Sequence, residues 1–422
     1  MIGFDSHPDS FTAAMLRGQT PAQAVIERVY NQLPMAQLRS WAQKNTTPLD
    51  LIVLEASGNS FHIVRTLEAL GRRALVLESA HLGKLKEAHA NTDKISAVRI
   101  AKGYLAGTAR IVWVPDSKSQ ERRDGFHAYQ KSVKRCTQVT NRLLSFLSDN
   151  GVRLPGNGRD LPGDTAAEVL RGLHDWPASQ WRVIEGLLLD RRHAEEQRAH
   201  WQRVIAQEVI ADPLLLSLVR LCGIRDTIAF ALGAIIGDIR RFAEPAKLVK
   251  YFGLNPALDS SGEGEWRGGI GGHGRSDIRA LLIEAAQSIL RSDNALAAWG
   301  KKLMGRKGSK NLAVAAIARK LTVSVWYLMM GRWKPVEEID DALSLKIGKI
   351  VSKANAGEPK PARAAHKRLR EQVEKSLLTG RIYHLDPKKR FEPKAPVADP
   401  STAPTGQDNP CFEALAVPAG VG

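Results

Sequence analysis

Three acidic residues near the start of the chain have types and spacing that suit metal-dependent phosphoryl transfer. Asp5 ends a short apolar run, Glu55 lies near the end of the apolar run LIVLE, and Asp93 opens a segment with helical character. Carboxylates at strand ends and at a helix start can converge on one edge of a sheet, where they would hold Mg²⁺ through oxygen ligands. Bound metal would stabilise the attacking and leaving oxygens of a phosphodiester. Each acid taken singly is also common as a turn or capping residue.

A second candidate site lies in a glycine-dense segment far downstream. The letters DSSG place Ser261 directly before Gly262, and seven glycines fall between positions 262 and 274. Glycine lets a backbone approach a phosphate closely, and a serine in such a loop can attack a phosphodiester when a metal or base activates it. Three arginines that could neutralise a phosphate accompany the glycines: Arg267, Arg275 and Arg279. A plain surface loop is the alternative interpretation.

The charge balance indicates a polyanionic partner. Lys and Arg total 61 and Asp and Glu total 44, which gives a formal net charge of +17. Residues 346–394 alone contain 14 Lys or Arg against 5 Asp or Glu, and such a segment suits salt-dependent binding to a nucleic-acid backbone. No amphipathic helix lined with aromatic residues accompanies it, so a membrane surface is the less favoured partner.

Composition and patterning exclude several other classes of protein. A hydrophobic fraction of 43% is ample for packed cores and excludes a wholly disordered chain. The three cysteines lie too far apart in sequence for a disulfide framework or a zinc cluster. No uninterrupted apolar run reaches the roughly 18–20 residues that span a bilayer, and the N-terminus MIGFDSHPDS does not resemble a secretory signal. We therefore expect a soluble, cytoplasmic protein of two or three domains.

Residues 1–115 are expected to form an α/β domain that positions the three acids. Strand–helix–strand order after position 50 predicts a parallel strand pair with a covering helix. The elements that apolar spacing predicts are a hairpin of strands over 2–4 and 11–16, a helix over 21–45 broken at Pro34, a strand in LDLIVLEASG, a helix in FHIVRTLEALG, a strand in RALVLES, a helix over 91–106 and a strand over 111–115.

The rest of the chain reads as mainly helical. Residues 116–212 contain two long charged helices with near-heptad apolar spacing, which fits an antiparallel hairpin, an intermolecular coiled coil or an ordinary bundle layer. Residues 213–335 are expected to be helical apart from the glycine-dense break at 261–274. Within them, residues 221–242 suggest a helix–hairpin–helix, whose amides often contact DNA phosphates, although close helix packing would also explain its glycines. Residues 336–422 read as a basic, partly disordered tail.

Taken together, these segments resemble the DEDD transposases of bacterial insertion sequences, understood as bridge-RNA-guided serine recombinases. IGFDSH is similar to the family's Gly-Ile-Asp strand, LIVLEASGNS to its Leu-Glu-Ala-Thr-Gly segment and NTDKISAVRIA to its Lys-Thr-Asp helix. Downstream, GIRDTIAFALGAIIGDIRRFAEPAKLVKYFGLNP resembles the start of its C-terminal transposase domain. SSGEGEWRGGIGGHGRSDIRALLIEAA resembles its Ser-Gly block, with the same interval from Gly262 to Gly268. The resemblance covers about residues 1–330, and the joint order of the segments makes it specific.

The resemblance implies a fold, an activity and partners. Residues 1–115 would be a RuvC-like domain with the RNase H fold, followed by a dimerising coiled coil and a mainly α transposase domain with a helix–hairpin–helix. Asp5, Glu55 and Asp93 would bind Mg²⁺, and Ser261 would be the nucleophile. A noncoding bridge RNA would pair with target and donor DNA, and dimers would form a tetramer in which acids and serines of different protomers share active sites. The residues implied to contact nucleic acid are Gly262, Arg267, Gly268, Arg275 and Arg279. The cell would be bacterial and the protein cytoplasmic, associated with the nucleoid.

Two departures from the family pattern keep alternatives open. The family's fourth acid falls at Ser96, whose hydroxyl can bind Mg²⁺ or its water but brings no negative charge. In the serine block, basic residues of the family are replaced by Gly269, Gly272 and His273. The chain is then a divergent recombinase, a metal-only nuclease of the Holliday-junction type in which Ser261 is structural, or an inactive relative that binds DNA and RNA. His7, close to Asp5 in sequence, could approach the metal site or be an ordinary surface histidine.

Overall fold

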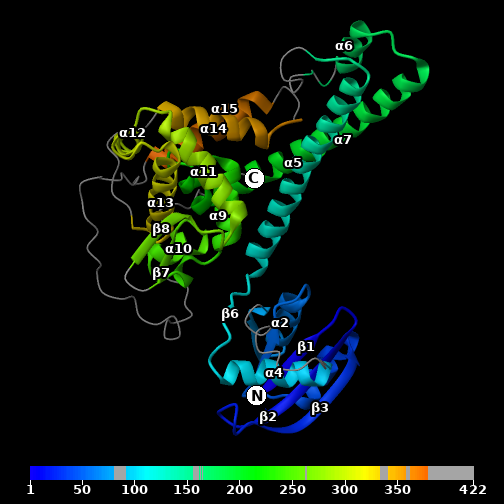
Figure 1. The fold of residues 1–422 in the computed structure, drawn as a ribbon, viewed down its shortest axis with the longest axis vertical. Helices are drawn as coiled ribbons and strands as arrows, with labels where there is room; N and C mark the ends of the chain where they lie inside the picture. The colour runs from blue at the N-terminus through cyan, green and yellow to red at the C-terminus, as the bar shows by residue number, and fades with distance from the viewer. Residues whose placement is uncertain are drawn as a thin grey trace. The chain divides into compact units, whose positions relative to one another are not determined.

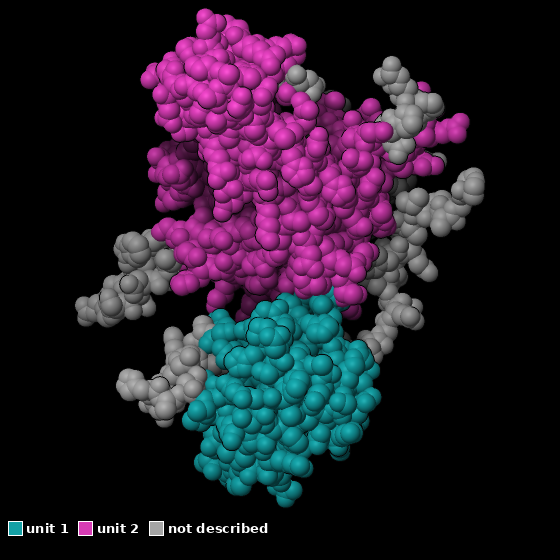
Figure 2. All heavy atoms as spheres, turned by 90° about the vertical axis from the view of Figure 1, so that its right-hand side faces the viewer, with its two compact units in different colours: residues 1–116 teal, residues 117–422 magenta. Residues whose placement is uncertain are grey.

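The computed structural model describes residues 1–79, 92–154, 161, 163, 165–261, 264–332, 341–357 and 362–378. For residues 257–261, 264–268, 341–342, 362–363, 366 and 374–378 it describes the backbone alone. The chain divides into two compact units, Met1–Asp116 and Ser117–Gly422, which are coloured separately in Figure 2. The first unit is mixed α/β and the second is mainly helical.

A six-stranded mixed sheet forms the centre of the first unit, with the strand order β3-β2-β1-β4-β5-β6. Strands β1, β2 and β3 form an antiparallel meander, β4 and β5 run parallel to β1, and β6 pairs antiparallel with β5. The strand bounds are β1 (Ile2–Ser6), β2 (Ser10–Arg17), β3 (Val25–Pro34), β4 (Leu51–Glu55), β5 (Arg73–Leu77) and β6 (Ile111–Val112).

Helices cover both faces of this sheet. Alternate residues of a strand point to opposite faces. In β4, Leu54 packs with α1 (Leu38–Asn45) and α2 (Ser60–Glu68), while Val53 packs with α4 (Asp93–Leu105). Two apolar cores therefore sandwich the sheet. The predicted first hairpin, the parallel strand pair and the helices at 60–68 and 93–105 are confirmed.

The prediction of a helix over 21–45 is wrong for its first half. Residues 25–34 form β3, an edge strand paired with β2 alone, and only the second half is helical, as α1. Val25 is 66% exposed, so its spacing to Val29 marks no buried helix face. The β-branched and aromatic residues of VIERVY suit a strand. Pro34 ends β3 at the sheet edge, where a missing N–H is tolerated.

The second unit begins with two long helices that pair within the chain, α5 (Ser117–Asp149) and α7 (Ala178–Ala211), with the short α6 (Ala166–Leu173) between them (Figure 1). Near the start of α5, Arg122 bonds Asp212, just past the end of α7, at 2.6 Å. Past the end of α5, Asn150 accepts a bond from Gln180 at the start of α7, at 2.7 Å. The two helices are therefore antiparallel, which is the hairpin among the three predicted arrangements.

The remaining helices share one apolar core, to which α9, α11 and α13 contribute many of the fully buried side chains. Their bounds are α8 (Pro213–Leu218), α9 (Asp226–Ile236), α10 (Pro245–Tyr251), α11 (Ser276–Leu290), α12 (Ala295–Lys307), α13 (Lys310–Met329), α14 (Asp341–Ala354) and α15 (Ala362–Leu378). A 3-10 turn, η2 (Ile239–Arg241), and a hairpin of β7 (Pro256–Ser261) and β8 (Gly264–Ile270) complete the unit. Helix α13 is long and apolar enough to cross a membrane, but 67% of its apolar window is buried, as in a core helix.

Part of the range expected to be a basic tail is folded onto this core. Ile347 and Val351 of α14 are almost fully buried in the shared apolar cluster. Lys353 of the same helix pairs with Asp226 at the start of α9, at 2.6 Å. Residues 393–422, the part of this tail for which we predict disorder, lie outside the described residues. The range 221–242 contains one α-helix, α9, and the 3-10 turn η2, and α8 ends before this range, at Leu218. The helix–hairpin–helix predicted for these residues is therefore not confirmed.

Candidate active site

Two of the predicted acids sit side by side on neighbouring strands. Strands β1 and β4 are parallel, and Phe4 pairs with Leu54, so Asp5 and Glu55 occupy the next position on each strand. The charge of Glu55 acts on the Asp5 carboxyl, as does the charge of Asp93. The sheet edge therefore brings the three acids into one electrostatic neighbourhood, as the sequence predicts.

Asp93 reaches the same edge from helix α4. The hydroxyl of Thr92 caps this helix by accepting a bond from the Ile95 amide at 3.4 Å. Asp93 thus falls in the first turn, where the helix dipole favours negative charge. A Cβ on Gly3 of β1 would lie 1.9 Å from the Ala97 carbonyl oxygen, so glycine is what allows α4 to lie this close to the strand.

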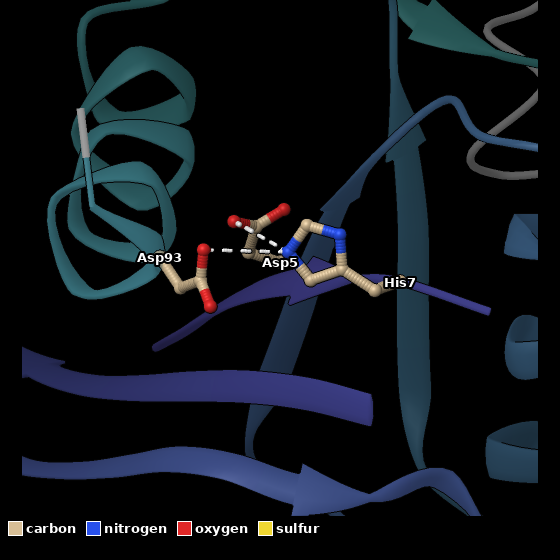
Figure 3. A group of neighbouring side chains, drawn as sticks. All are labelled: Asp5, His7 and Asp93. Carbon is tan, nitrogen blue, oxygen red and sulfur yellow. Dashed lines mark ion pairs between the residues drawn. The ribbon is translucent and has the colours of Figure 1, made fainter. Parts of the chain in front are cut away.

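His7 joins two of the acids (Figure 3). Its Nε2 lies 3.9 Å from Asp5 Oδ2 and 3.4 Å from Asp93 Oδ1. One ligand atom from each of these three residues lies within 4.8 Å of the others, a spacing at which they could hold a metal ion. Glu55 is not a member of this group. The sequence allowed a metal-site role for His7 without favouring it, and the Asp-x-His spacing was the available signal.

Burial raises the pKa of the Asp5 carboxyl, and among its charged neighbours His7 lowers that pKa, Asp93 and Glu55 raise it, and Arg99 lowers it. Carboxylates that raise one another's pKa are crowded negative charges, which a divalent cation would neutralise. The donor set of two carboxylates, an imidazole and a neighbouring carboxylate therefore fits a bound divalent metal.

Ser96 occupies the position at which the resemblance implies a fourth acid. It lies one turn after Asp93 on α4 and is only 6% exposed. Its hydroxyl accepts a hydrogen bond from the Arg99 guanidinium at 3.2 Å. A neutral group thus stands beside a cation at this position.

Polar residues outside the predicted set hold the site together. The Ser6 hydroxyl lies 3.0 Å from the Ser57 hydroxyl, and the Asn59 amide donates to the His7 carbonyl at 2.9 Å. The loops after β1 and β4 are therefore bonded to each other. On the other side, the Gln32 amide donates to Asp93 Oδ2 at 3.1 Å. Gln32 lies at a register shift of β3 and has a φ of +50°, which sequence patterns do not reveal.

Ser261 lies at the turn end of the β7–β8 hairpin. It is the last residue of β7 and pairs with Gly264, the first residue of β8. Gly262 lies outside the described residues, and Arg267 and Gly268 fall in β8, where only the backbone is described. The glycine-dense segment predicted as a break is therefore largely a strand. Its pairing with residues 256–261 was not visible in the sequence because glycines carry no apolar alternation.

The base of this hairpin is tightly packed. Gly253 has a φ of +67°, and a Cβ there would lie 1.8 Å from the His273 carbonyl oxygen. Arg279 donates to that same oxygen at 2.8 Å, and Arg275 pairs with Asp277 at 2.7 Å. Two of the three arginines predicted to meet a phosphate thus also bond the chain itself. Beside β8, an open cavity of about 530 Å³ is lined by residues that include Gly272 and Arg279.

Part of this chain matches a known protein family, and the chain is similar to several known proteins. The family model described as Transposase IS116/IS110/IS902 matches residues 217–299, a range that contains α9 to α11 and the β7–β8 hairpin. The chain is also similar to the transposase for insertion sequence element IS1111A of Coxiella burnetii, with 25% identity over 286 residues, which are 66% of this chain and 77% of that protein.

Two further relatives carry similar names. A Sinorhizobium fredii protein named as a transposase is 28% identical over 55% of this chain, and the match spans just over half of its length, 56%. A Pseudomonas aeruginosa protein named "Probable family 20 transposase" is 24% identical over 71% of this chain and 88% of its own length. These similarities support a relation to the transposases of insertion sequences, which act on DNA.

Proposed function

We propose that this protein is a DNA recombinase of the insertion-sequence type, which cuts and rejoins DNA through Ser261 with metal-assisted phosphoryl transfer. The observation that carries the proposal is the convergence of Asp5, Asp93 and His7, with Glu55 on the neighbouring strand, at one sheet edge. The same chain carries Ser261 at a hairpin turn, and Ser261 lies inside the range that matches the transposase family model.

The topology of the first unit supports this proposal. An antiparallel β1–β2–β3 meander next to parallel strands β4 and β5 is compatible with the RuvC-like, RNase H fold that the resemblance implies. The acids lie where β1 and β4 end and where α4 begins, which is the arrangement expected of metal-binding carboxylates in that fold.

The proposed reaction uses the Ser261 hydroxyl as the nucleophile. Its oxygen attacks the phosphorus of a DNA phosphodiester, the bond from phosphorus to one strand oxygen breaks, and that strand leaves with a free hydroxyl. The transient phosphoserine keeps the energy of the broken bond. A hydroxyl from another strand then attacks the phosphoserine, which reseals DNA and frees Ser261, so strand exchange requires no ATP.

Mg²⁺ is the metal proposed for the acidic edge, where it would stabilise charge on the pentacovalent phosphorus. Asp5 and Asp93 would bind it, with Glu55 and His7 positioned to contribute a ligand atom or to hold a water. Gln32 orients Asp93 through its hydrogen bond, and the Asn59 bond to His7 fixes the opposite side.

Guide RNA and assembly belong to the proposal through the resemblance alone. A bridge RNA would select the target and donor DNA, and protomers would assemble as dimers and tetramers in which acids and serines act together. The net charge of +17 supports binding to a polyanion. Leu189 of α7 is 67% exposed, which leaves apolar surface on the helical hairpin for a second copy.

A covalent-adduct assay tests the proposed reaction. The full chain, expressed beside its flanking DNA so that element RNA is present, would be given target plasmid and Mg²⁺ and then denatured. We expect protease-sensitive DNA on the wild-type protein and none on Ser261→Ala. Ser260→Ala, the adjacent serine, is the matched control and should retain the adduct.

The two alternative functions give different results in this assay. Cleavage that persists in Ser261→Ala without any adduct would identify a metal-only nuclease. Salt-sensitive binding of DNA and RNA, unchanged by Asp5→Asn and without cleavage under any divalent metal, would identify an inactive relative. Either result would overturn the proposed reaction.

A further inference from the structure

Two arginines from distant parts of the second unit are bonded to the end of helix α9. Arg123 of α5 donates from Nε to the Ala234 carbonyl at 3.0 Å and from its NH2 group to the Ile235 carbonyl at 3.1 Å. Arg241 of η2 donates to the Ile236 carbonyl at 2.9 Å and to the same Ile235 oxygen at 3.1 Å. Because they share one acceptor, the two guanidinium groups are held next to each other.

A tyrosine and a third arginine complete this group. The Arg241 guanidinium lies over the Tyr251 ring, 4.7 Å from its centroid. The Arg275 backbone amide donates to the Tyr251 carbonyl at 3.0 Å, and the Arg275 guanidinium pairs with Asp277. We call Arg123, Arg241, Arg275 and Tyr251 the arginine cluster.

The arginine cluster concentrates positive charge in a partly buried place. Burial lowers the pKa of Arg123 and of Arg241, the Tyr251 side chain opposes that shift, and repulsion from Arg275 adds to it. Arg123 is only 8% exposed, whereas the Arg275 side chain is 28% exposed and can be reached from solvent. Three cations against the bonded carboxylate of Asp277 leave a net charge of 3 − 1 = +2.

Such a group favours an anion with several oxygens. Guanidinium forks match phosphate geometry, and an anion would relieve the repulsion among the three cations. The carbonyls at the end of α9 already fix Arg123 and Arg241, so little side-chain freedom remains to be lost on binding. Asp238, whose negative charge also acts on Arg241, is bonded bidentately to Arg240 at 3.0 and 2.8 Å.

We propose that the arginine cluster binds one phosphate of a nucleic-acid backbone, with Arg241 and Arg275 as the groups that contact it and Arg123 and Tyr251 behind them. The cluster lies at the base of the hairpin, where Arg275 and Tyr251 flank β8 and β7. Ser261 lies at the other end of β7, five residues beyond Pro256, which is about 17 Å of extended strand. The phosphate held here is therefore an anchoring phosphate and not the one that Ser261 would attack.

This inference rests on the proposed function in one respect, namely that the protein acts on nucleic acid. The test measures binding of full-length protein to two labelled probes, a duplex DNA of about 30 base pairs and a single-stranded RNA of equal length, between about 50 and 200 mM salt. Arg241→Gln should weaken binding several-fold at low salt and reduce the slope of log affinity against log salt by about 0.9 for duplex DNA, or about 0.7 for single strands. Arg240→Gln, one residue away and paired with Asp238, is the matched control.

A second variant protects the test against loss of structure. Arg275→Gln removes a cluster guanidinium that bonds Asp277 and none of the α9 carbonyls, and it should reduce the slope in the same way. If these arginines only supported the fold, the variants would show a lower thermal midpoint or a smaller fraction of binding-competent protein. The salt slope of the remaining folded protein would stay unchanged, because that slope counts the ions displaced on binding. A slope change with the DNA probe, the RNA probe or both supports the site and identifies the source of the phosphate.

Three outcomes would overturn the inference. Unchanged slopes for both probes in folded Arg241→Gln and Arg275→Gln would show that the cluster only supports α9. An equal slope change in Arg240→Gln would show a general loss of surface charge. If the wild-type protein binds neither probe, the proposed function fails together with this inference. If the cluster variants bind both probes normally and the wild-type protein forms a Ser261-dependent adduct, only this inference fails.

Discussion

At the scale of single residues, Ser96 decides how strongly the acidic edge can hold a metal. Its buried hydroxyl accepts from Arg99 and lies one helical turn from Asp93. A serine there adds no charge to attract Mg²⁺, and the neighbouring guanidinium disfavours a cation. Affinity would then depend on Asp5, Asp93 and their neighbours Glu55 and His7.

We therefore expect Ser96→Asp to raise Mg²⁺ affinity about threefold or more, because it adds a hard anionic ligand beside Asp93 and neutralises Arg99. Ser96→Ala should leave the affinity within about twofold, whereas Asp93→Asn should lower it about tenfold, which corresponds to about 1.4 kcal/mol. Calorimetric titration of the full-length protein with Mg²⁺ measures all three. Asp9→Asn is the control, because Asp9 is an exposed carboxylate in the turn between β1 and β2 that also contains His7. If Ser96→Ala lowered Mg²⁺ affinity as much as Asp93→Asn does, this account would be contradicted.

At the scale of elements, the closeness of α4 to β1 determines the site geometry. Gly3 faces the Ala97 carbonyl, and any side chain there must push the helix outward. Because the Thr92 cap places Asp93 at the start of that helix, an outward shift also moves Asp93 away from Asp5 and His7.

Gly3→Ala should therefore lower both stability and metal affinity. Overpacking of this kind costs about 1–3 kcal/mol, and Mg²⁺ affinity should fall with it. Urea unfolding and calorimetric titration measure the two effects. Gly58→Ala is the matched control, because a Cβ on Gly58 meets no atom within 4 Å. Normal metal affinity in a destabilised Gly3→Ala protein would show that Asp93 does not depend on this contact.

The junction of α7 and α8 depends on one carboxylate. Asp212 caps α8 by accepting from the Leu214 amide at 2.9 Å, and it pairs with Arg122 and Lys118, while Glu208 also faces Arg122. Burial by itself would raise the pKa of Asp212, but the hydrogen bond and charge of Arg122, together with Lys118 and the Leu214 amide, lower it below its usual value.

A lowered folded-state pKa means that Asp212 stabilises the fold above the unfolded-state pKa of about 3.9 and that this contribution disappears as pH falls through and below that value. Asp212→Asn should thus cost about 1–2 kcal/mol near pH 7 and progressively less below about pH 4. Urea midpoints of wild type and variant over this pH range give the difference. A difference that stays constant down to about pH 3 would show that charge at Asp212 contributes nothing.

The elements that sequence predicted best are those with strong periodicity. The β1–β2 hairpin, the strand LIVLE and the two long charged helices carry regular apolar spacing, which local sequence suffices to reveal. Strand β3 was mistaken for a helix because Val25 and Val29 imitate a helical spacing, although Val25 is exposed and only Val29 packs against a core. Strand β8 was mistaken for a break because its glycine-rich sequence has no strand pattern of its own. It is a strand because it pairs with β7.

The residues of the candidate site also divide into those that local sequence predicts and those that only the folded chain reveals. Asp5, Glu55 and Asp93 were predicted from strand ends and a helix start, and the structure brings them together at one edge. Gln32 could not be predicted, because its position depends on a register shift between β2 and β3. The arginine cluster joins α5, η2 and the segment after β8, and only tertiary folding brings such distant positions together.

At the scale of the whole molecule, the proposed metal-binding acids and the proposed nucleophile belong to different units of the chain. The acids lie in the unit Met1–Asp116 and Ser261 lies in the unit Ser117–Gly422. The central claim is that both serve one reaction on DNA. A phosphoserine bond is the product that no purely metal-dependent nuclease and no inactive binder would form.

The most direct measurement is to locate that bond. Adduct from the full-length protein, its element RNA and target DNA would be digested with nuclease and protease, and the nucleotide-bearing peptide would be sequenced by mass spectrometry. We predict a nucleotide on Ser261, present in wild type and Ser260→Ala and absent after Asp5→Asn. A nucleotide on any other residue, or DNA cleavage with no nucleotide-bearing peptide, would contradict the account.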